Sequence, residues 1–215
     1  MGGMNIFDVK LTCYMVELYK TDLRDLLLPR GQAAIKLDIK ESAALGGMVY
    51  IPGVTEIPIK SIPETIKIFE YGLEHRMTRA TKMNDSSSRS HLIFAIIIDA
   101  TNKQTRMRTV GKLSFVDLAG SERGGKTGTD KEGAAEGRAI NQSLSALGNV
   151  ISALSKGSDH IPYRDHPLTL LMKDSLGGSA KTLMFVNVSP SNYNESESKN
   201  SMEYATRVKK IKNKV

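Results

Sequence analysis

The sequence predicts an α/β fold, in which strands form a sheet and helices form layers packed against it. Two observations favour this class. Apolar runs of strand length alternate with runs of helical periodicity along the chain. The chain has 215 residues, of which 40% are hydrophobic, which is enough to build one substantial core. We therefore expect residues 1–215 to belong to one domain.

In the first half of the chain, alternating apolar and polar residues predict strands. The helix expected after Pro63 places Ile66, Phe69 and Leu73 on one face. The predicted elements, in order, are a strand at 10–19, a helix at 21–28, strands at 37–39 and 48–51, a helix from residue 63, and strands at 90–100 and 111–117.

In the second half, apolar residues recur at helical spacing from Ile140 to Leu154, and Gly157 is expected to end that helix. The closing helix should turn Met202, Ala205, Val208 and Ile211 inward. The predicted elements, in order, are a helix at 138–154, a helix at 167–176, a central strand at 182–188 and a helix at 197–211.

Composition limits the classes of partner. The net charge of +7 and pI near 9.4 favour an acidic partner, such as nucleic acid, an anionic membrane or an acidic protein, although excess charge can also simply aid solubility.

A single cysteine, Cys13, excludes a disulfide framework and fits a reducing cytoplasm. No run of about eighteen apolar residues predicts a membrane span, and the first four residues lack signal-peptide character.

The segment 117–127 has two interpretations. Gly120 to Thr127 fits the phosphate-binding pattern G-x-x-x-x-G-K-[ST]. Asp117 to Glu122 instead fits an acidic residue at the end of a buried strand followed by a glycine turn that senses a phosphate. A phosphate-binding loop needs a helix starting at its Lys-Thr, and Gly128 and Gly133 disfavour one there. Because the helical pattern begins near Arg138, we favour the second interpretation.

A polar octet, N-D-S-S-S-R-S-H at 84–91, precedes the apolar strand predicted at 90–100. Serine hydroxyls can bind Mg²⁺ or phosphate oxygens, and an arginine can pair with a carboxylate. Taken alone, the octet is equally compatible with an ordinary serine-rich loop.

Together the two segments carry a family resemblance. N-x-x-S-S-R-S-H followed by D-L-A-G-S-E resembles switch I and switch II of the kinesin motor domain. The likeness extends from about residue 7 to 211, and it is strongest toward the kinesin-14 group and its kinesin-like calmodulin-binding proteins. The segments that carry it further lie at 140–154, 160–165, 174–178 and 200–208, and those that indicate the group lie at 14–19, 25–29, 111–116 and 181–188.

The resemblance implies a P-loop NTPase-like kinesin motor fold, in which a central, mostly β layer is sandwiched by helices. In that family the first strands, the P-loop and its helix precede the strand at 10–19, so we expect this chain to lack them. The implied function is that of a fragment of an ATP-driven, minus-end-directed microtubule motor. The alternative is a catalytically silent kinesin-homology module that binds microtubules. A nucleic-acid binder is disfavoured because the sequence has no aromatic stacking platform and no helix-turn-helix pattern.

The resemblance also implies roles for individual residues. Ser88 would reach Mg²⁺, Asp117 would hold it through water, and Ser87 would help hold the γ-phosphate and the attacking water. Asn84 would belong to the nucleotide-binding set. The backbone N–H of Gly120 would bind the γ-phosphate, while a salt bridge between Arg89 and Glu122 would close switch I on switch II. His91 is expected to be a packed histidine rather than a proton carrier.

The implied ligands are ATP and Mg²⁺ in an intact motor, and we expect neither to bind stably to this chain alone. The implied partner is the microtubule in the cytoplasm, whose acidic surface suits the positive charge. A calmodulin-like regulator would act beyond Val215, and neither nucleic acid nor membrane is expected. Gln142 stands where the family usually has lysine, and Pro167 and Leu170 replace two cations. The microtubule-facing candidates are Lys126, Lys131, Gln142, Ser143, Arg164 and Lys173.

Overall fold

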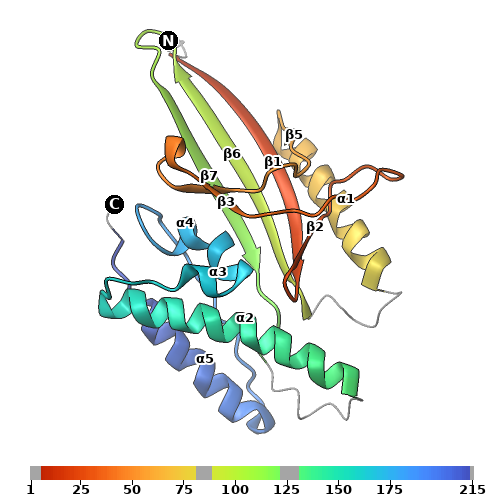
Figure 1. Cartoon of the computed structure of the whole chain (residues 1–215), viewed down its shortest axis with the longest axis vertical. Helices are drawn as coiled ribbons and strands as arrows, with labels where there is room; N and C mark the ends of the chain where they lie inside the picture. The colour runs from red at the N-terminus through yellow and green to blue at the C-terminus, as the bar shows by residue number, and fades with distance from the viewer. Residues whose placement is uncertain (1–5, 81–88, 122–130, 214–215) are drawn as a thin grey trace. The chain divides into compact units, whose positions relative to one another are not determined.

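The computed structural model describes residues 6–80, 89–121 and 131–213 (Figure 1). The chain divides into two compact units. We call the first, Met1–Asp38 with Ile51–Ala119, the sheet unit, and the second, Ile39–Tyr50 with Gly120–Val215, the helical unit.

The sheet unit contains an antiparallel sheet in the order β2-β1-β6-β7, with β5 pairing to β1 as well. Helix α1 (Ile62–Ala80) belongs to this unit and contacts β1. The strands are β1 (Phe7–Tyr19), β2 (Asp22–Asp25), β5 (Ile57–Pro58), β6 (His91–Asn102) and β7 (Arg108–Asp117).

The register of the long strands decides which residues become neighbours. Leu92 at the start of β6 pairs with Glu17 near the end of β1 and with Asp117 at the end of β7. Directly paired residues point to the same face of a sheet, so Glu17, Leu92 and Asp117 form one row across three strands. The end of the polar octet, where β6 begins, and the segment that starts with Asp117, where β7 ends, therefore meet at one end of the sheet.

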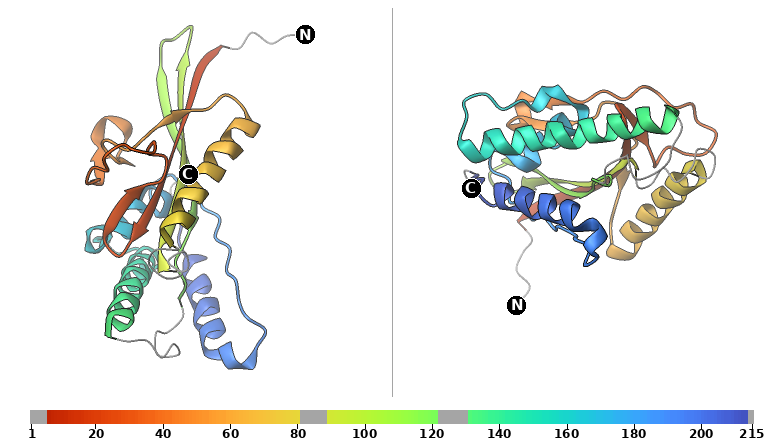
Figure 2. Two further views of the ribbon diagram at one scale, coloured as in Figure 1. Left: turned by 90° about the vertical axis from the view of Figure 1, so that its right-hand side faces the viewer. Right: turned by 90° about the horizontal axis from the view of Figure 1, so that it is seen from below.

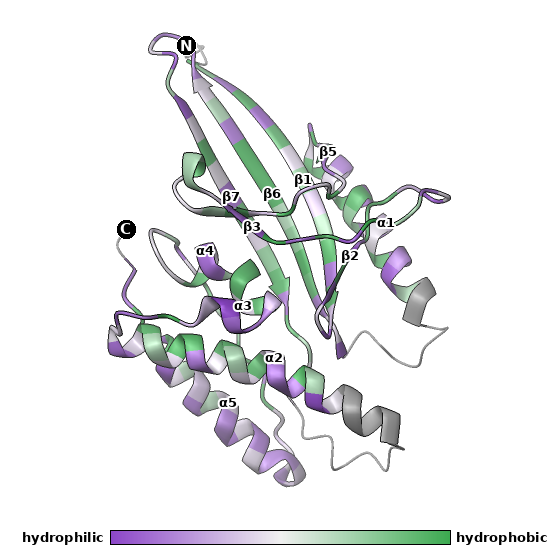
Figure 3. Ribbon diagram, viewed as in Figure 1, coloured by the Kyte–Doolittle hydropathy of each residue, from purple (hydrophilic) through white to green (hydrophobic). Residues whose placement is uncertain are grey.

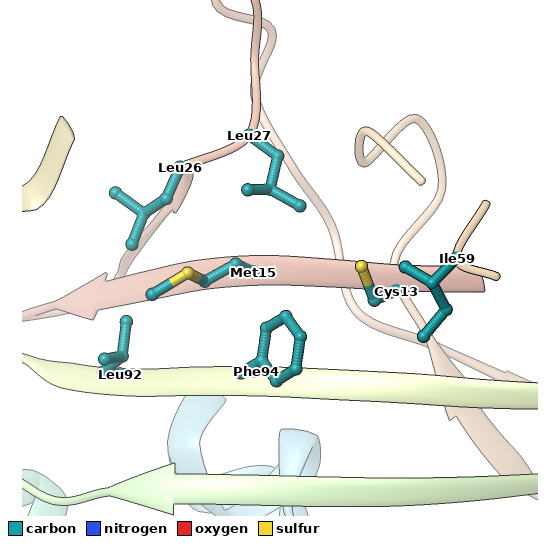
Figure 4. Packing of buried hydrophobic residues seen from close by; sticks show 7 residues of the cluster. All are labelled: Cys13, Met15, Leu26, Leu27, Ile59, Leu92 and Phe94. Atoms are coloured by element: carbon teal, nitrogen blue, oxygen red, sulfur yellow. The ribbon is translucent and has the colours of Figure 1, made fainter. Parts of the chain in front are cut away.

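Helix α1 covers the face that carries this row. The buried core beneath it contains residues of β1, of β6 and of the segments after β2 and β5. Figure 4 shows Met15 of β1 between Leu26 and Leu92. Phe69 of α1 meets Phe94 edge-to-face, with ring centroids 5.4 Å apart. The core residues are Cys13, Met15, Leu26, Leu27, Ile59, Leu92 and Phe94.

The helical unit is built on α2 (Lys131–Lys156) and α5 (Glu195–Val208), which lie side by side in both views of Figure 2. It also contains α3 (Pro167–Leu171), α4 (Lys173–Leu176) and a small hairpin of β3 (Lys40–Ser42) and β4 (Met48–Tyr50). The apolar stripe predicted on the long helix is the core here, since Leu147, Val150 and Ile151 are buried.

The prediction of a helix at 21–28 is wrong. Residues 22–25 form β2 and turn back on β1, with Tyr19 paired to Asp22. Asp25 accepts hydrogen bonds from the backbone N–H groups of Leu27 and Thr55, which holds the chain after β2 in a non-helical path. The strand predicted at 37–39 is also displaced, because β3 begins only at Lys40.

The helices of the second half differ from prediction at their boundaries. Helix α2 begins at Lys131 rather than near Arg138, because a glycine costs only about 1 kcal/mol inside a helix and propagation from a packed helix adds one bond per residue. Gly157 ends it as predicted, with φ of 66°. The helix predicted at 167–176 is two short helices separated at Met172.

The strand predicted at 182–188 is not formed. Thr182, Met184 and Val186 line a pocket of about 310 Å³ together with residues of α5 and the chain just after it. On the opposite side, Leu183 and Phe185 are 77% and 79% exposed. The alternation is therefore real, but no strand in the described part of the chain pairs with this segment, and a strand exists only with a hydrogen-bonded partner.

Met202 of α5, which was predicted to point inward, is exposed. Ile66 of α1, which was predicted to share a face with Phe69 and Leu73, is exposed as well. Figure 3 shows hydrophobic residues along strand β6. Helix α5 is mostly hydrophilic in the same view, as expected for a helix that buries only one narrow apolar stripe. Among the described residues, every helix is too short or too polar to cross a lipid bilayer.

Candidate functional site

The candidate site is the end of the sheet where β6 begins and β7 finishes. Ser90 and His91 arrive there from the polar octet, and Asp117 and Ala119 begin the acidic segment. Although these pairs are far apart in sequence, the antiparallel register with Leu92 opposite Asp117 makes them neighbours. We call these four residues, with Glu17 and Arg76, the strand-end site.

A buried ionic cluster underlies this site. Arg76 projects from α1, and its Nη2 donates to the carbonyl and hydroxyl oxygens of Ser90 at 3.1 and 3.3 Å. The Ser90 hydroxyl in turn donates to Oε1 of Glu17 at 2.6 Å. Arg76 Nε lies 3.5 Å from the same Glu17 oxygen, and Arg24 Nη1 lies 3.6 Å from the other. All three central side chains, those of Glu17, Arg76 and Ser90, are buried.

Asp117 joins the cluster from the solvent side. Its Oδ2 lies 3.5 Å from Nη1 of Arg76, while its side chain is 72% exposed. The carboxylate is therefore oriented by a buried cation but still faces solvent. The Asp117 carboxylate can therefore bind a ligand from solvent while its contact with Arg76 keeps it oriented.

His91 provides a second link between the two segments. Its Nδ1 accepts a hydrogen bond from the backbone N–H of Ala119 at 3.0 Å, and its ring is buried. Because Nδ1 is the acceptor, the ring proton of the neutral form sits on Nε2. The prediction of a packed, hydrogen-bonded histidine is confirmed.

Glu17 and Arg76 were not predicted from the sequence, although the position of each in its periodic pattern carries a signal. Glu17 interrupts the apolar run C-Y-M-V-E-L-Y at the same strand parity as Cys13 and Met15. Arg76 lies seven residues after Phe69 and three after Leu73, on the face of α1 that meets the core. A charged residue at a position where the periodicity places core residues therefore indicates a buried ionic cluster.

The nucleotide-site candidates are only partly described. Asp117 ends β7, Arg89 is half-buried just before β6, and Gly120 is half-buried after Ala119. Asn84, Ser87, Ser88 and Glu122 lie outside the described residues, so the proposed Arg89–Glu122 pair is not seen. Within the ranges that are described, no group of three or more His, Cys, Asp or Glu side chains is arranged for a metal ion.

The predicted microtubule-facing residues differ in their exposure to solvent. Gln142 and Arg164 are exposed, as a contact with a partner requires. Ser143 is a correction: it is buried, and its hydroxyl donates to the carbonyl of Ile140 at 2.6 Å, because it lies on the core side of α2. Lys126 lies outside the described residues, and Lys131 begins α2 with a side chain that is not described.

Lys173 is engaged within its own unit. Its ammonium pairs with Glu41 of β3, and it lies 5.8 Å from the centroid of the Tyr163 ring. The neighbouring Asp174 accepts a hydrogen bond from the backbone N–H of Val49 at 2.9 Å. Lys173 therefore joins α4 to the β3–β4 hairpin, which reduces the charge that it can offer to a partner.

Residues 166–170, where Pro167 and Leu170 replace two cations of the family pattern, have a structural role. His166 is the N-cap of α3, and its Nδ1 accepts from the backbone N–H of Leu168 at 3.1 Å. Pro167 follows at the first helical position, where its missing N–H has no cost. Thr169 is buried and donates to the carbonyl of His166 at 2.7 Å. Burial lowers the pKa of His166, which favours the neutral acceptor.

Comparison with known proteins identifies the family. The family model described as kinesin motor domain matches residues 4–211, which is nearly the whole chain. The chain belongs to the kinesin motor-domain family. Its sheet and helices are accordingly those of the kinesin motor fold, as the switch-like segments predicted.

Individual kinesins agree with this. The chain is 54% identical to kinesin-like protein KIN-14E of Arabidopsis thaliana over 96% of its own length, which confirms the predicted likeness to the kinesin-14 group. It is 46% identical over 92% of its length to kinesin-like protein Klp68D of Drosophila melanogaster. A solved structure described as that of a fast kinesin superposes with a TM-score of 0.85 at 40% identity, covering 98% of this chain.

These kinesins are longer than the chain. It spans 16% of KIN-14E, 24% of Klp68D and 58% of the solved fast-kinesin chain. The activity of a complete motor is therefore a matter for proposal.

Proposed function

We propose that this chain supplies the γ-phosphate-sensing segments and the microtubule-facing surface of an ATP-driven, minus-end-directed microtubule motor. The observation that carries the proposal is the antiparallel register of β6 and β7, which joins the end of the switch I-like segment to the start of the switch II-like segment. Such a junction suits a device in which two loops respond together to one phosphate.

Among the described residues, Asp117 suits a role in holding Mg²⁺. Asp117 offers a hard carboxylate oxygen ligand, the type that Mg²⁺ prefers, on a side chain that faces solvent. Ser88 would hold the metal with Asp117, Asn84 and Ser87 would contact the nucleotide, and the N–H of Gly120 would face the γ-phosphate. When bound, the metal neutralises charge that develops on the phosphates.

The chain's own residues supply positioning. Arg89 and Glu122 would close one segment on the other, while His91 holds the backbone of Ala119 next to Gly120. Phosphoryl transfer to water depends mainly on positioning and electrostatics. We therefore assign these groups to orienting the reacting partners and to excluding bulk water.

The microtubule-facing surface consists of exposed polar residues of the helical unit, including Gln142 and Arg164. The chain's net charge of +7 suits the acidic tubulin surface. We expect the protein on microtubules in the cytoplasm. A calmodulin-like regulator would act through regions beyond Val215.

The test is microtubule-stimulated ATP hydrolysis by the full protein that carries this chain, combined with a polarity-marked gliding assay. We expect stimulated turnover, minus-end motion and loss of turnover in Asp117→Asn. Asp99→Asn removes a carboxylate from an exposed ion pair on the same sheet and should retain turnover. Microtubule binding without any ATPase would overturn the motor assignment in favour of a silent binding module.

A separate measurement addresses the P-loop-like motif at 120–127. Because this motif overlaps the switch II-like segment, we expect calorimetry of the chain alone to show no saturable Mg-ATP binding below millimolar concentration. Tight binding that Lys126→Ala abolishes would instead restore a phosphate-binding loop at this position.

A further inference from the structure

We propose that Arg76 is a positioning residue that couples the two phosphate-sensing segments to each other through the buried carboxylate of Glu17. This inference rests on the proposed function and adds a residue of α1, outside both segments, to its machinery.

The contacts of Arg76 reach both segments at once. Its Nη2 binds the carbonyl and hydroxyl oxygens of Ser90, and its Nη1 lies 3.5 Å from Oδ2 of Asp117. Ser90 lies one residue before β6, and Asp117 is the last residue of β7. A single guanidinium therefore contacts the segments on both sides of the junction.

Glu17 holds the guanidinium in place from below. Its Oε1 accepts the short hydrogen bond from Ser90 and lies 3.5 Å from Arg76 Nε, while Arg24 pairs with its other oxygen. The row Glu17–Leu92–Asp117 across the sheet places both carboxylates on the face that α1 covers. Arg76 therefore lies between one buried carboxylate and one exposed carboxylate.

A stability role alone explains this cluster poorly. Burying Arg76 and Glu17 has a large desolvation cost, and an apolar pair of similar size would stabilise the core at least as well. A planar fork with donors in several directions is instead suited to fixing the mutual geometry of several acceptors. Since Asp117 faces solvent while Ser90 is buried, a displacement of Asp117 would be transmitted through Arg76 to the start of β6.

The experiment compares Arg76→Met, which keeps the bulk, and Arg76→Lys, which keeps the charge, in the full protein. Arg108→Met is the matched control, because Arg108 forms a bidentate pair with Asp99 on the same sheet. Val16→Ala, a buried neighbour of Glu17, controls for lost stability. All proteins are assayed well below their unfolding temperatures.

We expect Arg76→Met to lower the microtubule-stimulated kcat about 10²-fold, the order of loss caused by a small misplacement of reacting groups. The KM for microtubules should change little, and Arg76→Lys should recover part of the rate. Combined with Asp117→Asn, Arg76→Met should cause little further loss, because the two residues act as one unit. Equal kcat in Arg76→Met and Val16→Ala, or additive losses with Asp117→Asn, would overturn the proposal.

A nucleotide-free measurement separates this inference from the motor assignment. Hydrogen exchange should be about tenfold faster in Arg76→Met than in Arg108→Met for peptides covering 89–93 and 117–121, as expected for loss of buried hydrogen bonds. Unchanged exchange in both peptides would overturn the coupling. A wild-type protein that shows this coupling but no ATPase would refute the motor function alone.

Discussion

His91 and Ala119 are joined by a hydrogen bond of 3.0 Å between a ring nitrogen and a backbone N–H that lie 28 positions apart in the sequence. The bond connects the first residue of β6 to the chain just after β7. We infer that this bond ties the two switch-like segments to each other where β6 begins and β7 ends.

Replacing His91 by alanine should therefore destabilise the fold. The variant leaves the buried N–H of Ala119 without its acceptor, which costs about 1–3 kcal/mol. Urea denaturation of wild type and variant measures the change. His160→Ala, at an exposed histidine, should shift the free energy of unfolding by no more than about 0.5 kcal/mol. Equal stability of the two variants would show that the contact is unimportant.

Arg89 and Glu122 should behave as one unit in the full protein. Either Arg89→Ala or Glu122→Ala should strongly reduce microtubule-stimulated turnover, and the double variant should lose little more, because each side chain acts through the other. Steady-state ATPase assays check this. The exposed Arg108–Asp99 pair offers the control, and its double alanine variant should stay near wild-type turnover. Additive losses at Arg89 and Glu122 would argue against the pair.

Gly72 should be needed for the packing of α1 on β1. A Cβ at this position would overlap the sulfur of Met15 and lie 3.2 Å from its terminal methyl, and Met15 is fully buried. Gly72→Ala gains about 1 kcal/mol in helix propensity but overpacks the core by about 1–3 kcal/mol. We expect net destabilisation by thermal unfolding. Met15→Ala should cost less in the Gly72→Ala background than in wild type, and simple additivity would contradict this.

His166 should make stability depend on pH. Burial lowers its pKa below the ordinary value of 6.5, so the unfolded chain binds the proton more readily than the folded chain. The contribution of the neutral ring is therefore complete above about pH 6.5 and is lost as the pH falls through the lower, folded pKa. His166→Asn keeps an N-cap acceptor without titrating. Its Tm should fall less than that of wild type between about pH 7 and about pH 5, and equal falls would refute this role.

Arg164 and Lys173, two cations of the helical unit, should differ in their contribution to microtubule binding. Arg164 is exposed, whereas Lys173 is already paired with Glu41. In co-sedimentation, Arg164→Glu should weaken binding more than Lys173→Glu at the same net charge. Binding should also fall steeply with salt as the Debye length drops from about 10 Å at about 0.1 M to about 3 Å at about 1 M. Salt-independent binding, or equal binding to DNA, would contradict the microtubule assignment.

The sequence alone predicted features that depend on local pattern. The long strands β1, β6 and β7, the helices α1 and α2 and the end at Gly157 follow from alternation, helical spacing and a glycine at positive φ. The ordered series of segments from the polar octet onward was specific enough to indicate the kinesin family, which the comparisons confirm.

Features that depend on distant partners were decided only by the tertiary structure. Residues 22–25 form a strand because β1 offers a paired edge, whereas 182–188, with a clearer alternation, has no paired strand among the described residues. Ser143 and Lys173 looked suitable for a partner, but packing buries the first and Glu41 engages the second. Glu17 and Arg76 lie 59 positions apart, and only the packing of α1 against β1 brings them together. Hydrogen bonds and ion pairs act over a few ångströms in space, so separation along the chain does not reveal them.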